Sequence, residues 1–124
     1  MTYLEELEAL TAKVPLLERQ VAQDDLAIEV AKDGLRNVEA GITLAGLEGA
    51  NKEARDAFLR AKTIADLDAQ KFMQQISTFE VERLELKQRL SEAAHRWRYL
   101  CLAQEYETAL TLIRAGKEKL EAHI

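Results

Sequence analysis

The sequence predicts an all-α protein: a long, coiled-coil-like antiparallel helical hairpin with a C-terminal helical extension, oligomerising into a bundle. Ala, Leu, Glu, Arg and Lys make up 71 of the 124 residues, a composition typical of long helices. The chain has one proline and five glycines, which is too little turn material for a fold of many short elements. Apolar residues also recur at alternating steps of four and three, which is the helical period.

The first helix is expected over residues 1–46. Its apolar stripe holds phase across Pro15, so we expect a kink there; the alternative is a separate short helix over residues 2–13. Asp24 is the one charged member of the stripe. The stripe consists of Tyr3, Leu7, Leu10, Val14, Leu17, Val21, Asp24, Ile28, Ala31, Leu35, Val38 and Ile42.

A turn is expected over residues 47–51, because three of the five glycines lie between residues 41 and 49. Gly49 suits a left-handed C-cap or turn position. Asn51 is a favourable N-cap for the next helix, and Glu53 suits its first turn.

The second helix is expected to run unbroken over residues 52–100, since this stretch has neither proline nor glycine. Lys62 and Arg83 are charged members of its stripe, and their long apolar stems can lie along the seam. Ser77 and Glu80 form a potential capping box that would restart a helix, but the stripe stays in phase there. The stripe is Phe58, Lys62, Ala65, Ala69, Phe72, Ile76, Phe79, Arg83, Leu86, Leu90, Ala93, Trp97 and Leu100.

A tight turn makes the two helices antiparallel neighbours, with the numbers of facing residues summing to about 97. This register brings the acidic start of the first helix close to Lys87, Arg89 and Arg96. Several apolar residues lie outside both stripes, and we expect them to form a second buried face in an oligomer. They are Leu16, Leu26, Val30, Leu59, Ile64, Leu67, Val81 and Leu84.

Residues 101–124 form the expected C-terminal extension. Here each apolar residue stands one position before the place that the four-three spacing of the second helix predicts. Such a phase shift indicates a new packing partner. Tyr106, Leu110, Ile113 and Leu120 are the expected oligomer interface of a dimer or larger assembly. Whether this extension folds back or continues the second helix, and the number of subunits, are open from the sequence.

The basic cluster around residues 83–99 is the part of the sequence with binding character. Arg89, Arg96, Trp97, Arg98 and Tyr99 interleave arginine with aromatic rings, a combination that stacks on nucleic-acid bases or on a small nucleotide. The structural alternative is that the arginines neutralise the acidic start of the first helix and Trp97 fills the seam. The net charge of −5 argues against a protein that coats nucleic acid.

We expect no catalytic residue, metal site or cofactor. Glu92 and His95 have the spacing of a di-iron ligand pair, but a second such pair is lacking and both flank the seam. His123 is expected to be a frayed end. Cys101 lies six residues from His95, on a different helical face, which does not suit a catalytic dyad.

The turn motif Gly49-x-Asn51-x-x-x-Arg55 resembles that of a widespread group of small, mostly uncharacterised bacteriophage and prophage proteins, in which it joins two helices. The resemblance covers roughly residues 1–100; Ala54 stands where those proteins commonly have an acidic residue. Some of them are encoded among phage replication or recombination functions. The resemblance implies a phage accessory protein of the host cytoplasm and supplies no catalytic residues.

Three functions are therefore considered. We favour a non-catalytic protein that assembles with itself and binds another protein through its helices. The alternatives are a nucleic-acid accessory factor using the cluster near Arg96, and an oligomeric sponge that sequesters a nucleotide immune signal. One cysteine, no long apolar segment and an acidic N-terminus favour a cytoplasmic protein without a signal peptide or membrane anchor.

Overall fold

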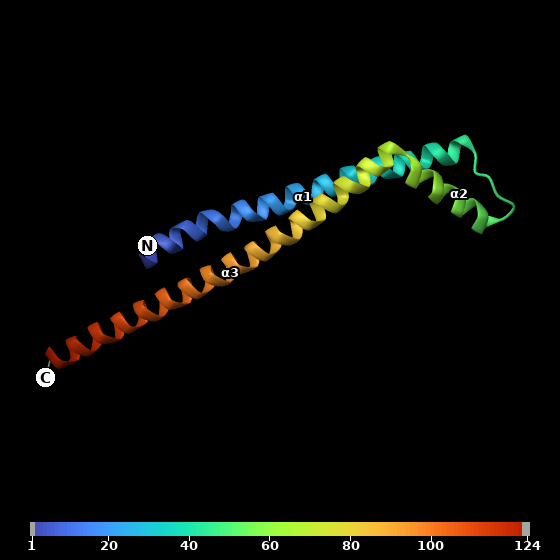
Figure 1. Cartoon of the computed structure of the whole chain (residues 1–124). Helices are drawn as coiled ribbons and strands as arrows, with labels where there is room; N and C mark the ends of the chain where they lie inside the picture. The colour runs from blue at the N-terminus through green and yellow to red at the C-terminus, as the bar shows by residue number, and fades with distance from the viewer. Residues whose placement is uncertain (1, 123–124) are drawn as a thin grey trace. The chain divides into compact units, whose positions relative to one another are not determined.

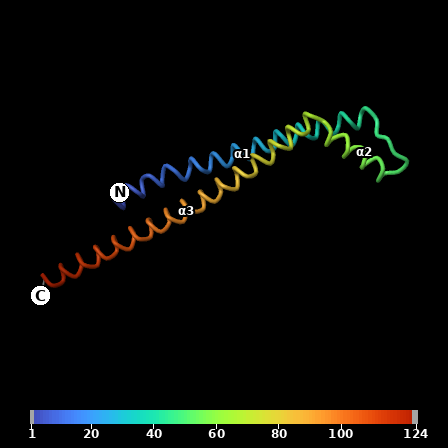
Figure 2. The backbone as a smooth tube through the Cα atoms, in the orientation of Figure 1, coloured from blue at the N-terminus to red at the C-terminus, as the bar shows by residue number. Residues whose placement is uncertain are grey.

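The computed structural model describes residues 2–122, which form three α-helices and no β-strand (Figure 1). Helix α1 spans Tyr3–Ala45, α2 spans Lys52–Ala65, and α3 spans Leu67–Ala122; Figure 2 traces the same path. The prediction of an all-α fold is confirmed.

The chain divides into two compact units. The first comprises Met1–Glu18 with Gln88–Ile124, and the second comprises Arg19–Lys87. In the first unit the start of α1 packs against the middle of α3, with Tyr3 at Leu100. In the second unit α1 again packs against α3, where Asp25 pairs with Arg83. In each unit the two helices are antiparallel.

The stripe predicted for the first helix is the buried face of α1. All twelve positions are buried or half-buried, whether they belong to the first unit, as Leu7 does, or to the second, as Ile28 does. Burying an aliphatic side chain of this size contributes about 1.5–3 kcal/mol. The helix continues through Pro15, so residues 2–13 are not a separate helix.

Asp24 is buried on this seam, with 7% of its surface exposed. Its Oδ2 has no hydrogen-bond partner among the described residues. An unpaired buried carboxylate oxygen costs folding free energy, so this position is not optimised for stability.

The turn between α1 and α2 is built by glycine and by Asn51. Gly46 and Gly49 have φ of 108° and 148°, which L residues rarely adopt, and a Cβ on Gly49 would lie 2.8 Å from the backbone nitrogen of Arg55. Asn51 Oδ1 accepts a hydrogen bond of 2.8 Å from the Ala54 N–H. The N-cap prediction is confirmed, and Gly49 occupies the turn, while Gly46 directly follows α1.

The prediction of one unbroken helix over residues 52–100 is wrong at Asp66. Asp66 adopts an extended backbone, and its N–H donates to the Lys62 carbonyl at 3.1 Å, which closes α2. Its Oδ1 accepts from the Ala69 N–H at 2.9 Å and thereby caps α3. As a result the predicted seam residues Lys62 and Ala65 are exposed, and Thr63 is buried instead.

The predicted sum of about 97 for facing residues is also wrong, although the expected proximity of the acidic start of α1 to Arg96 is confirmed. That sum pairs Glu6 with Ser91, whereas Glu6 contacts Arg96, five residues later. Asp25 contacts Arg83, eleven residues later than predicted. The register assumed a straight return after the turn, but the connection also contains α2 and the extended residue Asp66 and therefore uses more residues.

Residues 101–122 continue α3 without a break, so they do not fold back. We call this segment the C-terminal arm. From residue 104 onward its described residues are exposed except for Leu110, which is half-buried. The off-seam apolar residues are also exposed in the single chain, apart from Leu59, which is half-buried.

Among the described residues, the three helices contain no apolar stretch of sufficient length to cross a lipid bilayer.

Gly34 provides a test of helix packing in the second unit. A Cβ at this position would lie 2.6 Å from the ring of Phe72 on α3, so Gly34→Ala forces the ring to move. We expect the free energy of unfolding to fall by about 1–3 kcal/mol, less any gain in helix propensity. Gly41→Ala is the control, because nothing lies within 4 Å of its Cβ, and it should not destabilise. Urea unfolding followed by circular dichroism measures both; equal stability of the two variants would contradict the packing described here.

Candidate functional site

The predicted binding cluster lies on α3 in the first unit. Arg89 and Arg96 are seven residues apart and share one side of the helix, whereas Arg98 projects about 200° away from Arg96. These three arginines are exposed residues, and so are Trp97 and Tyr99. The five predicted residues therefore do not form one continuous binding surface.

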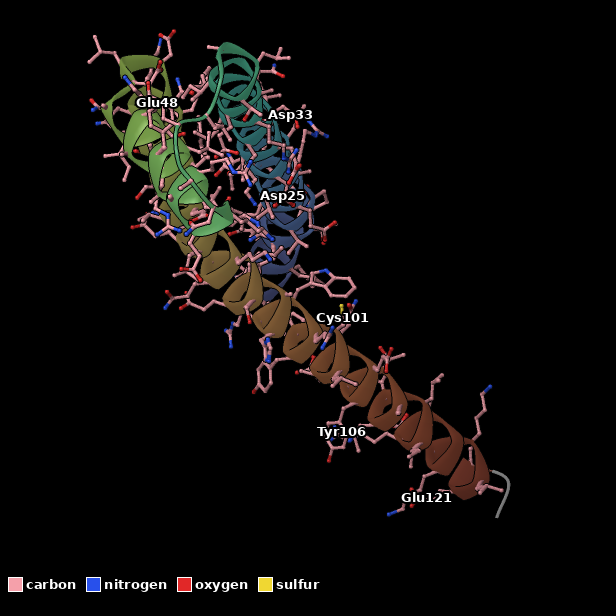
Figure 3. All side chains as sticks on the ribbon, turned by 90° about the vertical axis from the view of Figure 1, so that its right-hand side faces the viewer. Asp25, Asp33, Glu48, Cys101, Tyr106 and Glu121 are labelled. Carbon is pink, nitrogen blue, oxygen red and sulfur yellow. The ribbon has the colours of Figure 1, made fainter. Side chains whose placement is uncertain are left out.

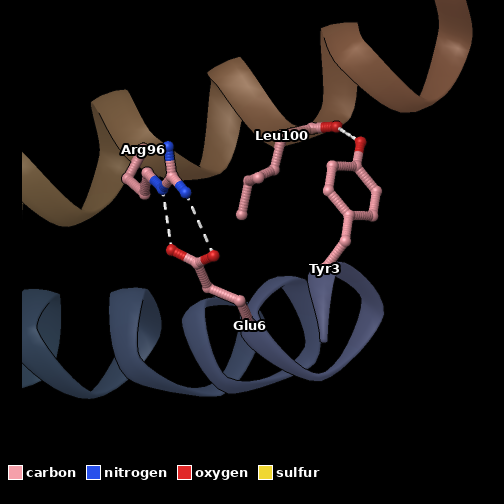
Figure 4. Close-up of polar contacts among 4 residues, drawn as sticks. All are labelled: Tyr3, Glu6, Arg96 and Leu100. Carbon is pink, nitrogen blue, oxygen red and sulfur yellow. Dashed lines mark hydrogen bonds and ion pairs between the residues drawn. The ribbon is translucent and has the colours of Figure 1, made fainter. Parts of the chain in front are cut away.

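Arg96 is held by an acidic residue of α1 (Figure 4). Its Nε donates to Glu6 Oε1 at 2.7 Å and its Nη2 to Glu6 Oε2 at 3.1 Å. This two-point geometry fixes the planar guanidinium against the carboxylate. Arg96 thus neutralises the acidic start of α1. This is the role that the sequence offered as the alternative to nucleic-acid or nucleotide binding.

The ion pair shifts the pKa of both partners. The hydrogen bonds from Arg96 lower the pKa of Glu6 below its usual value of 4.5, and burial only partly opposes this. The same hydrogen bonds raise the pKa of Arg96. Both side chains remain partly exposed, at 49% for Arg96 and 32% for Glu6, so solvent screens the pair.

The two aromatic residues beside Arg96 also have partners. Trp97 Nε1 donates a hydrogen bond of 3.1 Å to Thr11 Oγ1 on α1, and the residue keeps 38% of its surface exposed. The Arg96 guanidinium lies 5.3 Å from the centre of the Tyr99 ring, within the range of a cation–π contact. Trp97 therefore borders the seam rather than filling it.

Tyr3 anchors the start of α1 to α3. Its hydroxyl donates a hydrogen bond to the Leu100 carbonyl (Figure 4). Burial raises the pKa of Tyr3, and the nearby carboxylate of Glu107 raises it further. This contact places the first residues of α1 on the side of α3 that carries Leu100 and Glu107.

The predicted interface residues of the C-terminal arm present exposed apolar surface. Tyr106, Ile113 and Leu120 expose 66%, 66% and 69% of their surface, and Leu110 is half-buried. Figure 3 shows Tyr106 projecting outward from α3. Steps of three and four residues place all four on one side of the helix.

Cys101 is half-buried and borders a shallow groove of about 440 Å³ on the arm. Gln104, Glu105, Thr108, Ala109 and Leu112 complete its lining. No histidine is among these lining residues.

An apolar groove of about 360 Å³ lies between α1 and α3 in the second unit. Sequence reasoning missed it, although the off-seam pair Leu26 and Val30 was the available signal. Six of its lining residues are apolar and two are glutamines: Gln23, Leu26, Ala27, Val30, Ala31, Phe72, Gln75 and Phe79. A groove of this composition suits apolar side chains of another protein.

The described residues contain no group of three or more His, Cys, Asp or Glu side chains that could hold a metal ion. His95 Nδ1 donates to the Ser91 carbonyl at 2.8 Å, within its own helix. Glu92 is exposed. His123 lies outside the described residues.

Comparisons of the chain with protein-family models, with curated proteins and with solved structures find no match. The resemblance to phage and prophage proteins therefore stays a prediction.

The ion pair between Glu6 and Arg96 makes part of the stability pH-dependent. Because the folded state lowers the pKa of Glu6, its contribution is complete above about pH 4.5 and is lost as the pH falls through the lowered value. Glu6→Gln should lower the Tm at pH 7 and reduce the loss of Tm between about pH 5 and pH 3.

Thermal unfolding followed by circular dichroism measures this effect. Glu8→Gln is the matched control, since Glu8 is an exposed glutamate of the same helix. If both variants show the same pH dependence as the parent chain, the ion pair does not contribute to folding.

Proposed function

We propose that this chain is a non-catalytic phage or prophage accessory protein that acts in the host cytoplasm by assembling with itself and binding another protein. The C-terminal arm carries the proposal. It is a helix of about 30 Å, and most residues of its apolar stripe are exposed in the single chain. Isolated helices are only marginally stable in water, because most helical stability in proteins comes from packing. We therefore expect another helix to pack against the arm.

The apolar groove of the second unit supports the binding of another protein. Leu26 and Val30 expose 67% and 62% of their surface at this groove, next to the half-buried rings of Phe72 and Phe79. Such surface is rarely left exposed in contiguous patches unless a partner covers it.

The nucleotide and nucleic-acid alternatives have less support. Arg96 already pairs with Glu6, and Arg98 projects from the opposite side of α3. Native mass spectrometry of the protein purified from cells tests both: a retained nucleotide or oligonucleotide would favour these alternatives, and a retained protein would favour the main proposal.

The mass of the protein in solution tests self-assembly through the arm. Sedimentation across micromolar concentrations should give a dimer or larger species, and Ile113→Lys should shift the chain towards the monomer because a charge enters the apolar stripe. Leu112→Lys is the matched control: Leu112 exposes 68% of its surface, close to the 66% of Ile113, but lies on another side of the arm. A monomeric parent chain at all concentrations would contradict self-assembly.

A further inference from the structure

We propose that the C-terminal arm pairs with the same arm of a second copy of this chain, antiparallel and about a two-fold axis, with Leu110 of each copy opposite Ile113 of the other. This inference rests on the self-assembly proposed above and specifies its geometry.

The stripe of the arm has the spacing of a coiled-coil seam. Its positions repeat at steps of three and four over three heptads, so they correspond to alternating a and d positions. Within the described residues these side chains are exposed or half-buried, and thus available to a partner. They are Ala103, Tyr106, Leu110, Ile113, Lys117 and Leu120.

An antiparallel pair places each a position opposite a d position, and this sequence suits that arrangement. With Leu110 opposite Ile113, the small Ala103 faces the large Leu120 at each end of the seam. Between these layers Tyr106 faces Lys117, whose apolar stem can lie along the ring while its ammonium approaches the ring face. Each layer thus pairs a small residue with a large one, a cation with an aromatic ring, or two aliphatic side chains.

The residues flanking the seam are complementary in the same register. On one flank Glu107 comes opposite Arg114 of the other copy, and the two-fold axis repeats this ion pair. On the other flank Ala109 comes opposite Gly116, and these small residues allow the helices to approach closely. One relation between the copies thus satisfies the seam and both flanks.

A parallel pair in register is disfavoured by the same residues. It stacks Lys117 on Lys117, two like charges on the seam. It also leaves Glu107 and Arg114 at different levels, about 10 Å apart along the helix axis, without an opposite charge facing either. The charge pattern therefore selects the antiparallel orientation.

Helix α1 leaves this stripe accessible. Its first residues contact α3 through Tyr3, on the side of Leu100 and Glu107. Tyr106 and Ile113 lie on a different side of α3 and keep 66% of their surface exposed. Tyr106, Ile113, Lys117 and Leu120 are therefore exposed to a second helix, whereas Ala103 and Leu110 are half-buried in the single chain.

Charge reversal tests the register. Glu107→Arg and Arg114→Glu should each raise the dimer Kd about tenfold, because each replaces two attractions by two repulsions. The double variant restores both ion pairs with their polarity reversed and should return the Kd to near the parent value. Sedimentation equilibrium measures the Kd, and circular dichroism verifies that each variant stays helical. Glu105→Lys is the control, since this glutamate lies off the seam and its flanks, and it should leave the Kd unchanged.

Disulfide cross-linking tests the orientation without altering the charges. In a Cys101→Ser background, a mixture of Ala103→Cys and Leu120→Cys chains should form a mixed disulfide, and Ala103→Cys alone should form none. A disulfide between two Ala103→Cys chains would show a parallel pair and overturn the proposal. So would the absence of the mixed disulfide.

The two proposals fail in different ways. A parent chain that stays monomeric overturns both self-assembly and this inference. A dimer that gives no rescue in the double charge variant overturns the antiparallel register and leaves self-assembly standing.

Discussion

A hairpin of two helices can bury one stripe of side chains on each helix, and this constraint governs the molecule. In each unit the stripe of α1 meets α3, and the residues of that stripe lose most of their contact with water. Among the described residues, most apolar side chains off this stripe are exposed: Leu26 and Leu84 expose 67% and 71% of their surface. The remaining apolar surface, on the second unit and on the C-terminal arm, is therefore where partners are to be sought.

Asp24 places an acidic side chain in the apolar seam of α1 at a cost in stability. The apolar layers of this seam resemble one another, so they specify the alignment of the two helices less sharply than a polar residue does. A buried polar side chain penalises wrong alignments, as polar residues at a positions do in coiled coils. Arg83 on α3 pairs with the neighbouring Asp25, which places opposite charges on the two helices at this level. The ion pair between Asp25 and Arg83 forms in the observed register, whereas Asp24 leaves one side-chain oxygen unpaired there.

The sequence predicted those features that depend on local periodicity or on one side chain. The stripe of α1 and the Asn51 cap are of this kind, and both are confirmed. The break at Asp66 escaped prediction because the stripe keeps its phase across it; the charged Lys62 was the available sign that the seam is interrupted there. The partner of Arg96 was predicted as an acidic residue at the start of α1, but the register depends on the whole path of the connection. The groove around Phe72 and Phe79 requires two helices to be placed in space, which periodicity cannot supply.

The phase shift after Leu100 gives the arm its distinct role. Successive residues of an α-helix are about 100° apart, so a stripe that resumes one residue early is turned away from the side that α1 covers. Had the phase been kept, Gln104 and Glu107 would be the apolar positions, and the arm would present its apolar side in line with Tyr3. With the shift, Tyr3 closes the hairpin on one side of α3 while Tyr106 and Leu110 lie on another. The same helix therefore closes the hairpin on one side and carries exposed apolar residues such as Tyr106 on another.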